Sequence, residues 1–443
     1  MDVTSLEAGS ALLTPVRTSR VRRMQIIALI VMLVGGSIAF IDRTALSVAT
    51  PLIRKDFGLS MTEMGVLMSA LSWSYGLVQI PFGIVIDRLR PRIMLSASLV
   101  FWSVVQMCFS FSGNFWQFMI ARIFLGAGEG PQFPSSVVTV RDWFNVRERG
   151  FATGVFNGSS TFGPAVAMPL LSYLMLTLSW RSMFATLGIF GVVVGMLFYV
   201  FYRNPQQMNL TADEKAYLAV GEEPQKTGSL FSRKEWSQLF RFSSTWGTCV
   251  GWFGVLYGVW LYLGWLPVYL ERERHMSIMN SGWVASIPML SAFIGSLCAG
   301  RVMDMLVRRG VSPLNSRRYP LTACLLGSAL LTIVVAETPS DFIAVACVSL
   351  SMFLLLAGSA CVYSTPSIAV PQRYTGALTG IQNLAQLVGS SLPQFLTGYI
   401  VSETGSFHVA LFVTAGITAI SAVVYFSLVR RPISEEALQA RTA

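Results

Sequence analysis

The sequence predicts an all-α polytopic membrane protein with 12 transmembrane helices in two six-helix bundles. Its 443 residues are 53% hydrophobic and only 12% charged, whereas soluble domains carry about 25% charged residues. Apolar stretches of roughly 20 residues, the length of a membrane-crossing helix, recur along the whole chain. We expect spans at residues 24–49, 62–86, 93–112, 115–138, 150–177, 182–202, 244–270, 279–303, 319–336, 342–365, 375–401 and 407–429.

The basic residues predict how these spans cross the bilayer. An Arg-rich tail at residues 1–23 precedes the first span, and no small-residue cleavage site follows it, which argues against a signal peptide. With the tail inside, 25 of the 32 Lys and Arg residues fall in cytoplasmic segments and five in outside loops. This is the positive-inside pattern, and it places both termini in the cytoplasm. It also attributes the net charge of +10 to topology rather than to nucleic-acid binding.

A polar segment divides the predicted spans into equal sets. Residues 203–243 form the longest interruption, and we expect a cytoplasmic linker between bundles at 24–202 and 244–429, with a cytoplasmic tail at 430–443. Within the linker, "LTADEKAYL" carries Thr211 three residues before Glu214. This is the pattern of a capping box, and it predicts a short surface helix.

A short motif occurs once in each half. Residues 83–92 read "GIVIDRLRPR" and residues 300–309 read "GRVMDMLVRR", each at the end of the second span of its half. Glycine and aspartate four residues apart share a helix face, where the glycine permits close helix approach. The aspartate can then pair with a neighbouring arginine or a helix end. We therefore predict a conformational latch on the inner side, formed by Gly83, Asp87, Arg88, Arg92, Gly300, Asp304 and Arg308.

The first copy of this motif resembles the loop signature of the major facilitator superfamily. The segments "FIDRTALSVATPLI", "ARIFLGAGEGPQFPSS" and "GALTGIQNLAQLVGSSLPQFLTGYI" resemble the anion:cation symporter family, which includes bacterial uptake systems for galactonate, glucarate and hexuronates. The resemblance covers essentially the whole chain. It implies the major facilitator fold, a bacterial inner-membrane location, a monomer, and proton-coupled import of a small organic anion such as a sugar acid.

Four charged residues lie well inside predicted spans: Asp42, Arg43, Arg122 and Glu129. A charge at the bilayer centre costs at least about 2.5–3.5 kcal/mol, so such residues normally face a cavity. Arg122 and Glu129 are two helical turns apart and share one face, about 10 Å apart. Asp42 and Arg43 point about 100° apart, so they can serve different neighbours.

The charge types predict the roles of these four residues. A buried arginine is a bidentate partner for a carboxylate, sulfonate or phosphate, so we assign Arg43 and Arg122 to anion binding. Burial raises the pKa of a carboxylate and a nearby arginine lowers it, so such a group can exchange a proton near neutral pH. We therefore assign Asp42 and Glu129 to proton coupling. From the residues alone, two static ion pairs joining the first helix to the fourth are an equal alternative. In the galactonate-type relatives, the matching aspartate and glutamate are protonation sites, and the matching arginine of the fourth helix contacts substrate.

Neutral polar residues complete the predicted substrate site. Asn383 resembles the substrate-contacting asparagine of the family's eleventh helix, and Tyr75 matches the tyrosine of the second helix. Tyr257 and Tyr363 are further candidates for reading hydroxyl groups, with interhelical hydrogen bonding as the alternative for both. At Tyr363 the relatives often carry tryptophan. Gly128 and Gly130 flank Glu129, and at these two positions the relatives commonly carry small residues bulkier than glycine. We therefore expect a roomier or differently shaped site.

Other classes of function lack their sequence signatures. The chain contains no Gly-x-x-x-x-Gly-Lys-Ser/Thr motif and no metal-binding cluster, which argues against an enzyme and an ATP-driven pump and predicts no cofactor. Uptake of a sulfonate or an aromatic carboxylate, proton-driven efflux or exchange, and a non-transporting receptor remain as alternatives. The two arginines disfavour efflux of lipophilic cations, and a receptor has no need for titratable Asp42 and Glu129.

Overall fold

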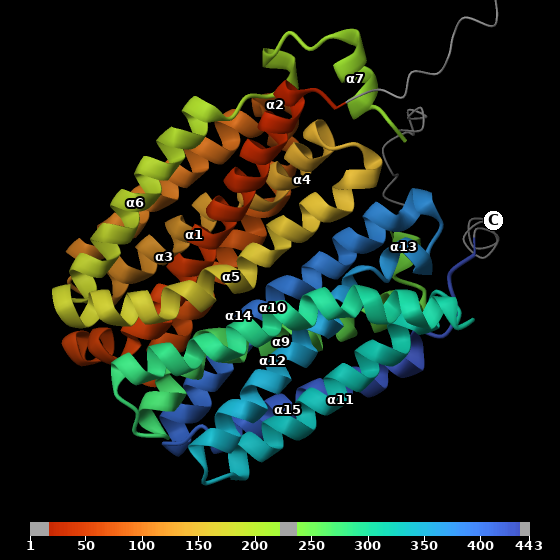
Figure 1. Ribbon diagram of the computed structural model, residues 1–443. Coiled ribbons are helices and arrows are strands. Elements are labelled where there is room, and N and C mark those ends of the chain that lie inside the picture. The colour runs from red at the N-terminus through yellow and green to blue at the C-terminus, as the bar shows by residue number, and fades with distance from the viewer. Residues whose placement is uncertain (1–16, 222–236, 435–443) are drawn as a thin grey trace, which may run out of the picture.

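A computed structural model describes residues 17–221 and 237–434, with side chains described except at residues 80, 83–89 and 372. The chain is helical throughout these ranges (Figure 1). The helices before the linker are α1 (Ser19–Phe57), α2 (Met61–Cys108), α3 (Phe115–Glu129), α4 (Gln132–Trp143), α5 (Val146–Leu178) and α6 (Trp180–Phe201). The linker contains α7 (Ala212–Leu218).

The helices after the linker form a second group. They are α9 (Ser243–Arg272), α10 (Ile278–Arg308), α11 (Asn315–Glu337), α12 (Asp341–Tyr363), α13 (Pro366–Ala369), α14 (Thr375–Thr404) and α15 (His408–Leu428). Three-residue 3₁₀ turns occur at Phe109–Phe111, Pro205–Gln207 and Gln372–Tyr374. Figure 1 shows the two groups side by side, with α7 at one end of the first group.

The helices account for the 12 predicted spans. Within the described ranges, nine helical segments are long and apolar enough to cross a membrane. The first half of α2, the pair α3 and α4, and α14 supply the other three, because polar residues and breaks lower their hydropathy while they pack alongside the nine. The all-helical fold class expected from the sequence is therefore confirmed.

Local backbone conformations and caps determine where the long helices bend, end and begin. α2 joins the second and third predicted spans through a bend at Arg90 (φ 59°), directly before Pro91. α1 ends at Gly58, whose left-handed φ of 67° lets its N–H bond to Arg54 O. α2 then begins with a capping box between Ser60 and Glu63.

The short linker helix forms as the capping pattern predicted. Thr211 accepts from the backbone N–H of Glu214, and the Glu214 carboxylate accepts from the N–H of Thr211. The same carboxylate accepts a bond of 2.7 Å from Thr18 Oγ1, the N-cap of α1. α7 is thus attached to the first group of helices at the end of α1.

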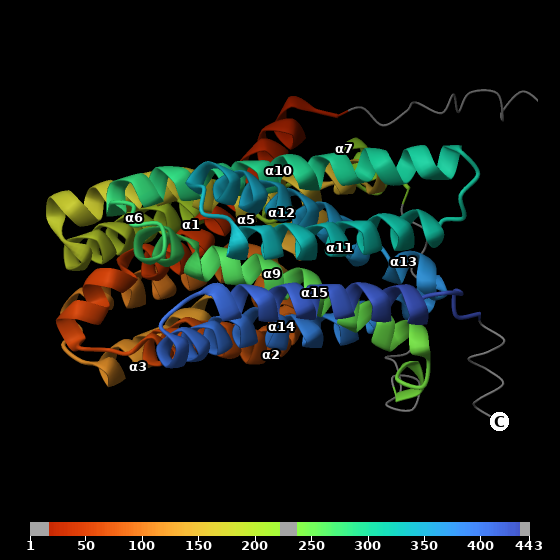
Figure 2. The same ribbon diagram turned by 90° about the horizontal axis from the view of Figure 1, so that it is seen from below.

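The two groups meet through three helix pairs: α2 with α14, α5 with α10, and α1 with α9. Figure 2 shows α14 lying along α2. The closest approaches lie at the end far from α7, where a methyl group added at Gly398 would lie 2.5 Å from Met61 O and one at Gly65 2.7 Å from Gln394 O. At the other end, Gly154 of α5 and Gly300 of α10 have no such neighbour within 4 Å. The groups are therefore in direct contact at the end far from α7, whereas these two glycine positions at the α7 end face open space.

Candidate functional site

The four charged residues predicted inside spans are buried near the interface between the groups. Asp42 and Arg43 lie on α1, while Arg122 and Glu129 lie on α3. Asp42, Arg122 and Glu129 are each at most 1% exposed, and the Arg43 side chain is 10% exposed. Such burial of charge is costly in a membrane, so each group needs a partner or a functional reason.

Arg43 and Glu129 form an ion pair that joins α1 to α3. The Nε and Nη2 atoms of Arg43 donate to Glu129 Oε2 over 2.8 and 2.6 Å. Aromatic rings surround the guanidinium: its Cζ lies 4.9 Å from the Phe40 ring centre, 4.7 Å from that of Tyr75 and 5.6 Å from that of Trp260. The rings shield the pair from water and stabilise the cation through their faces.

Arg122 has different surroundings. Its Nε and Nη2 atoms are buried, and among the described residues neither atom has a hydrogen-bond partner. The guanidinium lies over the uncharged ring of Phe109, whose centre is 5.3 Å from Cζ. A buried guanidinium with unused donors costs several kcal/mol. The donors are therefore available to an anion.

Asp42 is the second buried charge without an ion pair. Both carboxylate oxygens are buried, and neither is hydrogen-bonded to another described residue. The side chain lies beside the Trp102 indole and within electrostatic range of Glu129, Arg122 and Arg43. The predicted alternative of two static ion pairs is therefore half realised, because only the pair of Arg43 with Glu129 forms among the described side chains.

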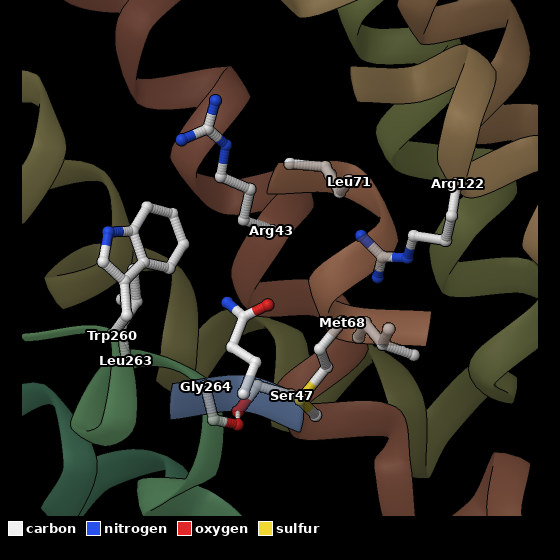
Figure 3. Close-up of a pocket in the computed structure, with 10 residues that line it drawn as sticks. Arg43, Ser47, Met68, Leu71, Arg122, Trp260, Leu263 and Gly264 are labelled. Carbon is white, nitrogen blue, oxygen red and sulfur yellow. Dashed lines mark hydrogen bonds between the residues drawn. The ribbon is translucent and has the colours of Figure 1, made fainter. Parts of the chain in front are cut away.

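A small cavity connects these charges with the second group of helices (Figure 3). Arg43 and Arg122 both line it; Figure 3 shows the Arg122 guanidinium directed toward the other lining residues and the Arg43 guanidinium directed away from them, with Trp260 of α9 beside Arg43. The rest of the lining is Leu46, Ser47, Met68, Leu71, Leu263, Gly264 and Gln394. At about 10 Å³ the cavity has room for a single water molecule. An organic anion can enter only if the helices move apart.

Residues of the second group reach the cavity at positions that differ from those predicted. Trp260 and Gln394 line it, whereas Tyr257, Tyr363 and Asn383 do not. Tyr257 packs against Phe253 and Tyr363 against Trp252, with ring centres 5.8 Å apart in both pairs. Their predicted contact with substrate therefore has no counterpart in the closed cavity. Tyr75 does not line the cavity, but its ring contacts the guanidinium of Arg43, which does.

The missed residues carried a weak sequence signal. Gln394 follows Pro393 within an apolar span, where a polar side chain needs a reason, and it is 4% exposed with Oε1 unpaired among the described residues. Ser47 donates to Gly264 O and so links α1 to α9 beside the cavity. Nothing in the sequence indicates that α1 and α9 cross there.

The glycines around Glu129 do not enlarge the site as expected. A methyl group at Gly128 would lie 2.8 Å from Phe101 and 2.9 Å from Trp102, and one at Gly130 would lie 3.3 Å from Val78. Both positions face α2 instead of the cavity. The absent side chains allow α3 to pack tightly on α2, so the expectation of a roomier site is wrong for this conformation.

The predicted latch is only partly described. The side chains of Gly83, Asp87 and Arg88 lie outside the described residues. Arg92 donates to Tyr199 O, stacks on the Tyr199 ring and holds the end of α6. In the second copy, Gly300 has no neighbour within 4 Å, and Asp304 and Arg308 are exposed. The close approach predicted at Gly300 is not formed here, because this position faces open space.

A helical membrane protein whose two groups of helices enclose a charged cavity at their interface has the architecture of a secondary transporter. The family model of the Major Facilitator Superfamily matches residues 32–394, and the chain belongs to this superfamily of transporters. The membership expected from the loop motif is confirmed, and the chain is not an enzyme.

Individual relatives match over nearly the full length. A probable L-galactonate transporter of Escherichia coli K12 is 39% identical over 420 residues, which cover 95% of this chain and 92% of the relative. The D-galactonate transporter of Escherichia coli O6:H1 is 29% identical, over 94% and 98% of the two chains. A bacterial homologue of the human lysosomal transporter Spinster, solved in an inward-facing conformation, has the same fold, with a TM-score of 0.77 at 16% identity over 93% and 98% of the chains.

Proposed function

We propose that this protein imports a small sugar-acid anion together with protons, by alternating access. The observation that carries the proposal is the buried Arg122 guanidinium, whose Nε and Nη2 atoms have no partner among the described residues. An anionic group in the cavity would supply the missing acceptors through charge-assisted, bidentate hydrogen bonds. A neutral sugar could not balance this charge.

Sugar acids are the substrate class that we favour. Two relatives that match nearly the whole chain are named for transport of L- and D-galactonate. A sugar acid has one carboxylate and several hydroxyl groups. Arg122 suits the carboxylate, while the Gln394 amide and the Ser47 hydroxyl, which line the cavity, suit hydroxyl groups. We keep Asn383, Tyr257 and Tyr363 as candidates for contacts in a more open state.

Proton coupling follows from the ion pair beside Arg122. Arg43 is held by Glu129, and protonation of Glu129 would release the Arg43 guanidinium for a second contact with the anion. An anion bound between the two arginines would in turn favour the protonated carboxyl group. By reciprocal linkage, proton and anion then each raise the affinity for the other. We assign Asp42 the same role beside Arg122.

Alternating access is supported by the contacts between the groups of helices. The cavity of about 10 Å³ excludes a sugar acid, so binding requires a separation of the groups. They touch at the end far from α7, whereas Gly154 and Gly300 at the α7 end face open space. We propose that the halves rock about the cavity, that α7 and both termini are cytoplasmic, and that residues 24–202 and 244–429 are the moving units.

Uptake into proteoliposomes tests the proposal. The panel contains L- and D-galactonate, glucarate, glucuronate and sulfoacetate, with galactose as the neutral control, each with and without an inward proton gradient. We expect one sugar acid to accumulate only with the gradient. If only sulfoacetate accumulates, the substrate class is a sulfonate instead of a sugar acid. The proposed role of Arg122 would be unchanged, because an arginine binds sulfonate and carboxylate groups alike. Gradient-independent movement of galactose would overturn the proposal.

A further inference from the structure

A row of side chains on α2 lies behind the two arginines, away from the cavity. Trp102, Gln106 and Phe109 are spaced four and three residues apart and therefore share one helix face. All three are fully buried, with 0% exposure. None of them lines the cavity, and the proposed function uses none of them.

Contacts at both ends of this row fix the position of Gln106. Trp102 lies beside Asp42 and packs against Gly128 of α3. Phe109, the first residue of the 3₁₀ turn that follows α2, lies under the Arg122 guanidinium at 5.3 Å. Along the helix, Gln106 therefore lies in the space between the Trp102 contact with Asp42 and the Phe109 contact with Arg122.

The polar atoms around this space are unpaired within the described chain. They are the donors Trp102 Nε1, Gln106 Nε2, Arg122 Nε and Arg122 Nη2, and the acceptors Asp42 Oδ1, Asp42 Oδ2 and Gln106 Oε1. Buried polar atoms in proteins are almost always hydrogen-bonded, to protein or to ordered water. These seven atoms belong to side chains of α1, α2 and α3, and the contact of the Trp102 indole with the Asp42 carboxylate still leaves the Gln106 and Arg122 atoms for a further ligand.

The mixture of donors and acceptors identifies the ligand. A metal cation would bind the three acceptors but would be repelled by four N–H donors, one pair of which belongs to a guanidinium. An anion would satisfy the donors and be repelled by Asp42. Water donates and accepts, and it is the common partner of buried groups that lack protein contacts.

We propose that Gln106 anchors bound water that bridges the Asp42 carboxylate to the Arg122 guanidinium. Gln106 is a positioning residue: its amide holds the water, and the water transmits substrate binding at Arg122 to the protonation of Asp42. A substrate anion on Arg122 weakens the bridge to ionised Asp42, and protonated Asp42 leaves Arg122 free for substrate. This inference rests on the proposed function and adds to it the physical link between the two sites.

Other charged groups near Asp42 act on the same equilibrium. The carboxylate of Glu129 and the guanidinium groups of Arg122 and Arg43 all lie within electrostatic range of Asp42, and Tyr75 contacts Arg43. Glu129 has its own arginine at 2.6 Å, so its influence persists when Gln106 is replaced. Loss of the water bridge should therefore reduce the pH dependence without abolishing it.

The test compares the pH dependence of substrate affinity in full-length protein. For the sugar acid that the uptake panel identifies, the wild-type Kd should rise by up to about tenfold per pH unit where one proton binds with the anion. Gln106→Met, which keeps length but removes the amide, should reduce the change to less than about threefold per unit. Gln106→Asn, which retains an amide, should restore part of the slope. Gln25→Met removes a buried amide bonded to Trp143 O and is the control, with an unchanged slope.

A second measurement reports the water directly. Radiolytic footprinting oxidises aromatic residues beside bound water, so Trp102 should be modified in the wild type despite its burial and protected in both Gln106→Met and Gln106→Leu. An unmodified Trp102 in the wild type would overturn the inference. A full pH slope in Gln106→Met would overturn it too, with the proposed function intact. Absence of anion binding in the wild type would defeat the proposed function, and this inference with it.

Discussion

Arg43 and Arg122 lie on neighbouring helices and have opposite surroundings. Arg43 is paired with Glu129 and enclosed by three aromatic rings, whereas the donors Nε and Nη2 of Arg122 find no acceptor in the described part of the chain. Arg43 is held by the Glu129 carboxylate, and protonation of Glu129 would release it. The second arginine has donors that no described protein group occupies, so an anion can accept from them. This asymmetry assigns the initial substrate contact to Arg122.

Replacement of Arg122 by lysine should weaken anion binding while the fold is retained. Lysine keeps the charge but offers no bidentate fork, and losing one charge-assisted bond costs about 1.5–3 kcal/mol, or roughly 10- to 100-fold in Kd. Isothermal titration with the transported sugar acid measures the change. Arg181→Lys, in an exposed pair with Asp56, is the control and should bind normally. An unchanged Kd in Arg122→Lys would remove Arg122 from the site.

The sequence predicted which residues are charged in the membrane but not how they pair. A charged residue within an apolar stretch is evident from the sequence alone, so the burial of Asp42, Arg43, Arg122 and Glu129 in the spans was predictable. The pairing of Arg43 with Glu129 depends on the direction of both side chains and on the crossing of α1 with α3. Gln394 and Trp260 were missed because they reach the cavity through the packing of α9 and α14 against the first group.

At the level of helices, two glycines form a close backbone contact between the two groups. Gly65 of α2 faces Gly398 of α14, and an added methyl group on either would meet backbone atoms of the other helix. Backbone cannot yield as a side chain can, so the contact is sensitive to a single carbon. It lies at the end that must open when the cavity is exposed to the opposite side.

Gly398→Ala should therefore separate α2 from α14 at this end. The overpacked closed state is expected to lose about 1–3 kcal/mol, enough to populate the state open at this end. Spin labels at Thr62 and Glu403 would report a longer distance by pulsed electron resonance. Gly376→Ala on the same helix has open space around it and is the matched control. Equal distance distributions in the two variants would show that the glycine contact does not control closure.

The linker helix α7 is held by an ionised carboxylate. The Thr18 hydroxyl and then the Thr211 backbone N–H donate to Glu214 and hold its pKa below its ordinary value of 4.5. Because the folded-state pKa is lowered, this contribution to stability is present above pH 4.5 and is lost as the pH falls through the folded-state pKa. The capping pair was visible in the sequence, but the bond to Thr18 was not, because 196 residues separate the two.

Glu214→Gln should imitate the acidic state at neutral pH. Without the charge, the bonds from Thr18 and Thr211 weaken, and the amides of residues 212–218 should exchange with solvent faster. Hydrogen exchange with mass spectrometry measures this effect. The exposed neighbour Asp213, changed to Asn, controls for the loss of one charge and should leave α7 protected. Equal exchange in the two variants would contradict the role of Glu214.

At the scale of the molecule, apolar stretch lengths predicted the spans well, and breaks within helices were harder to place. Arg90, directly before Pro91, has non-helical backbone angles and divides α2 into two helical parts, and α4 starts anew after the interruption at Gly130 and Pro131. Which helices of one group pack against which helices of the other was not predictable, because this pairing depends on surfaces that are distant in sequence. The basic residues predict a single orientation in the membrane.

Cysteine labelling from either side tests this orientation. In a variant without native cysteines, Ser312→Cys should react with an impermeant maleimide only after the cytoplasmic side is exposed. Glu403→Cys, at the far end of α14, should react in intact cells. The reverse pattern would place the termini outside and invert the direction of transport that we propose.

In the proposed mechanism, one protein site binds an anion and couples it to protons through Glu129. Its most direct test compares accumulation with exchange in Glu129→Gln, in proteoliposomes loaded with or without unlabelled sugar acid. Glutamine cannot ionise, so we predict that the variant keeps exchange of labelled for unlabelled substrate but no longer accumulates it under a proton gradient. Accumulation equal to that of the wild type would contradict the coupling role of Glu129 and the account built on it.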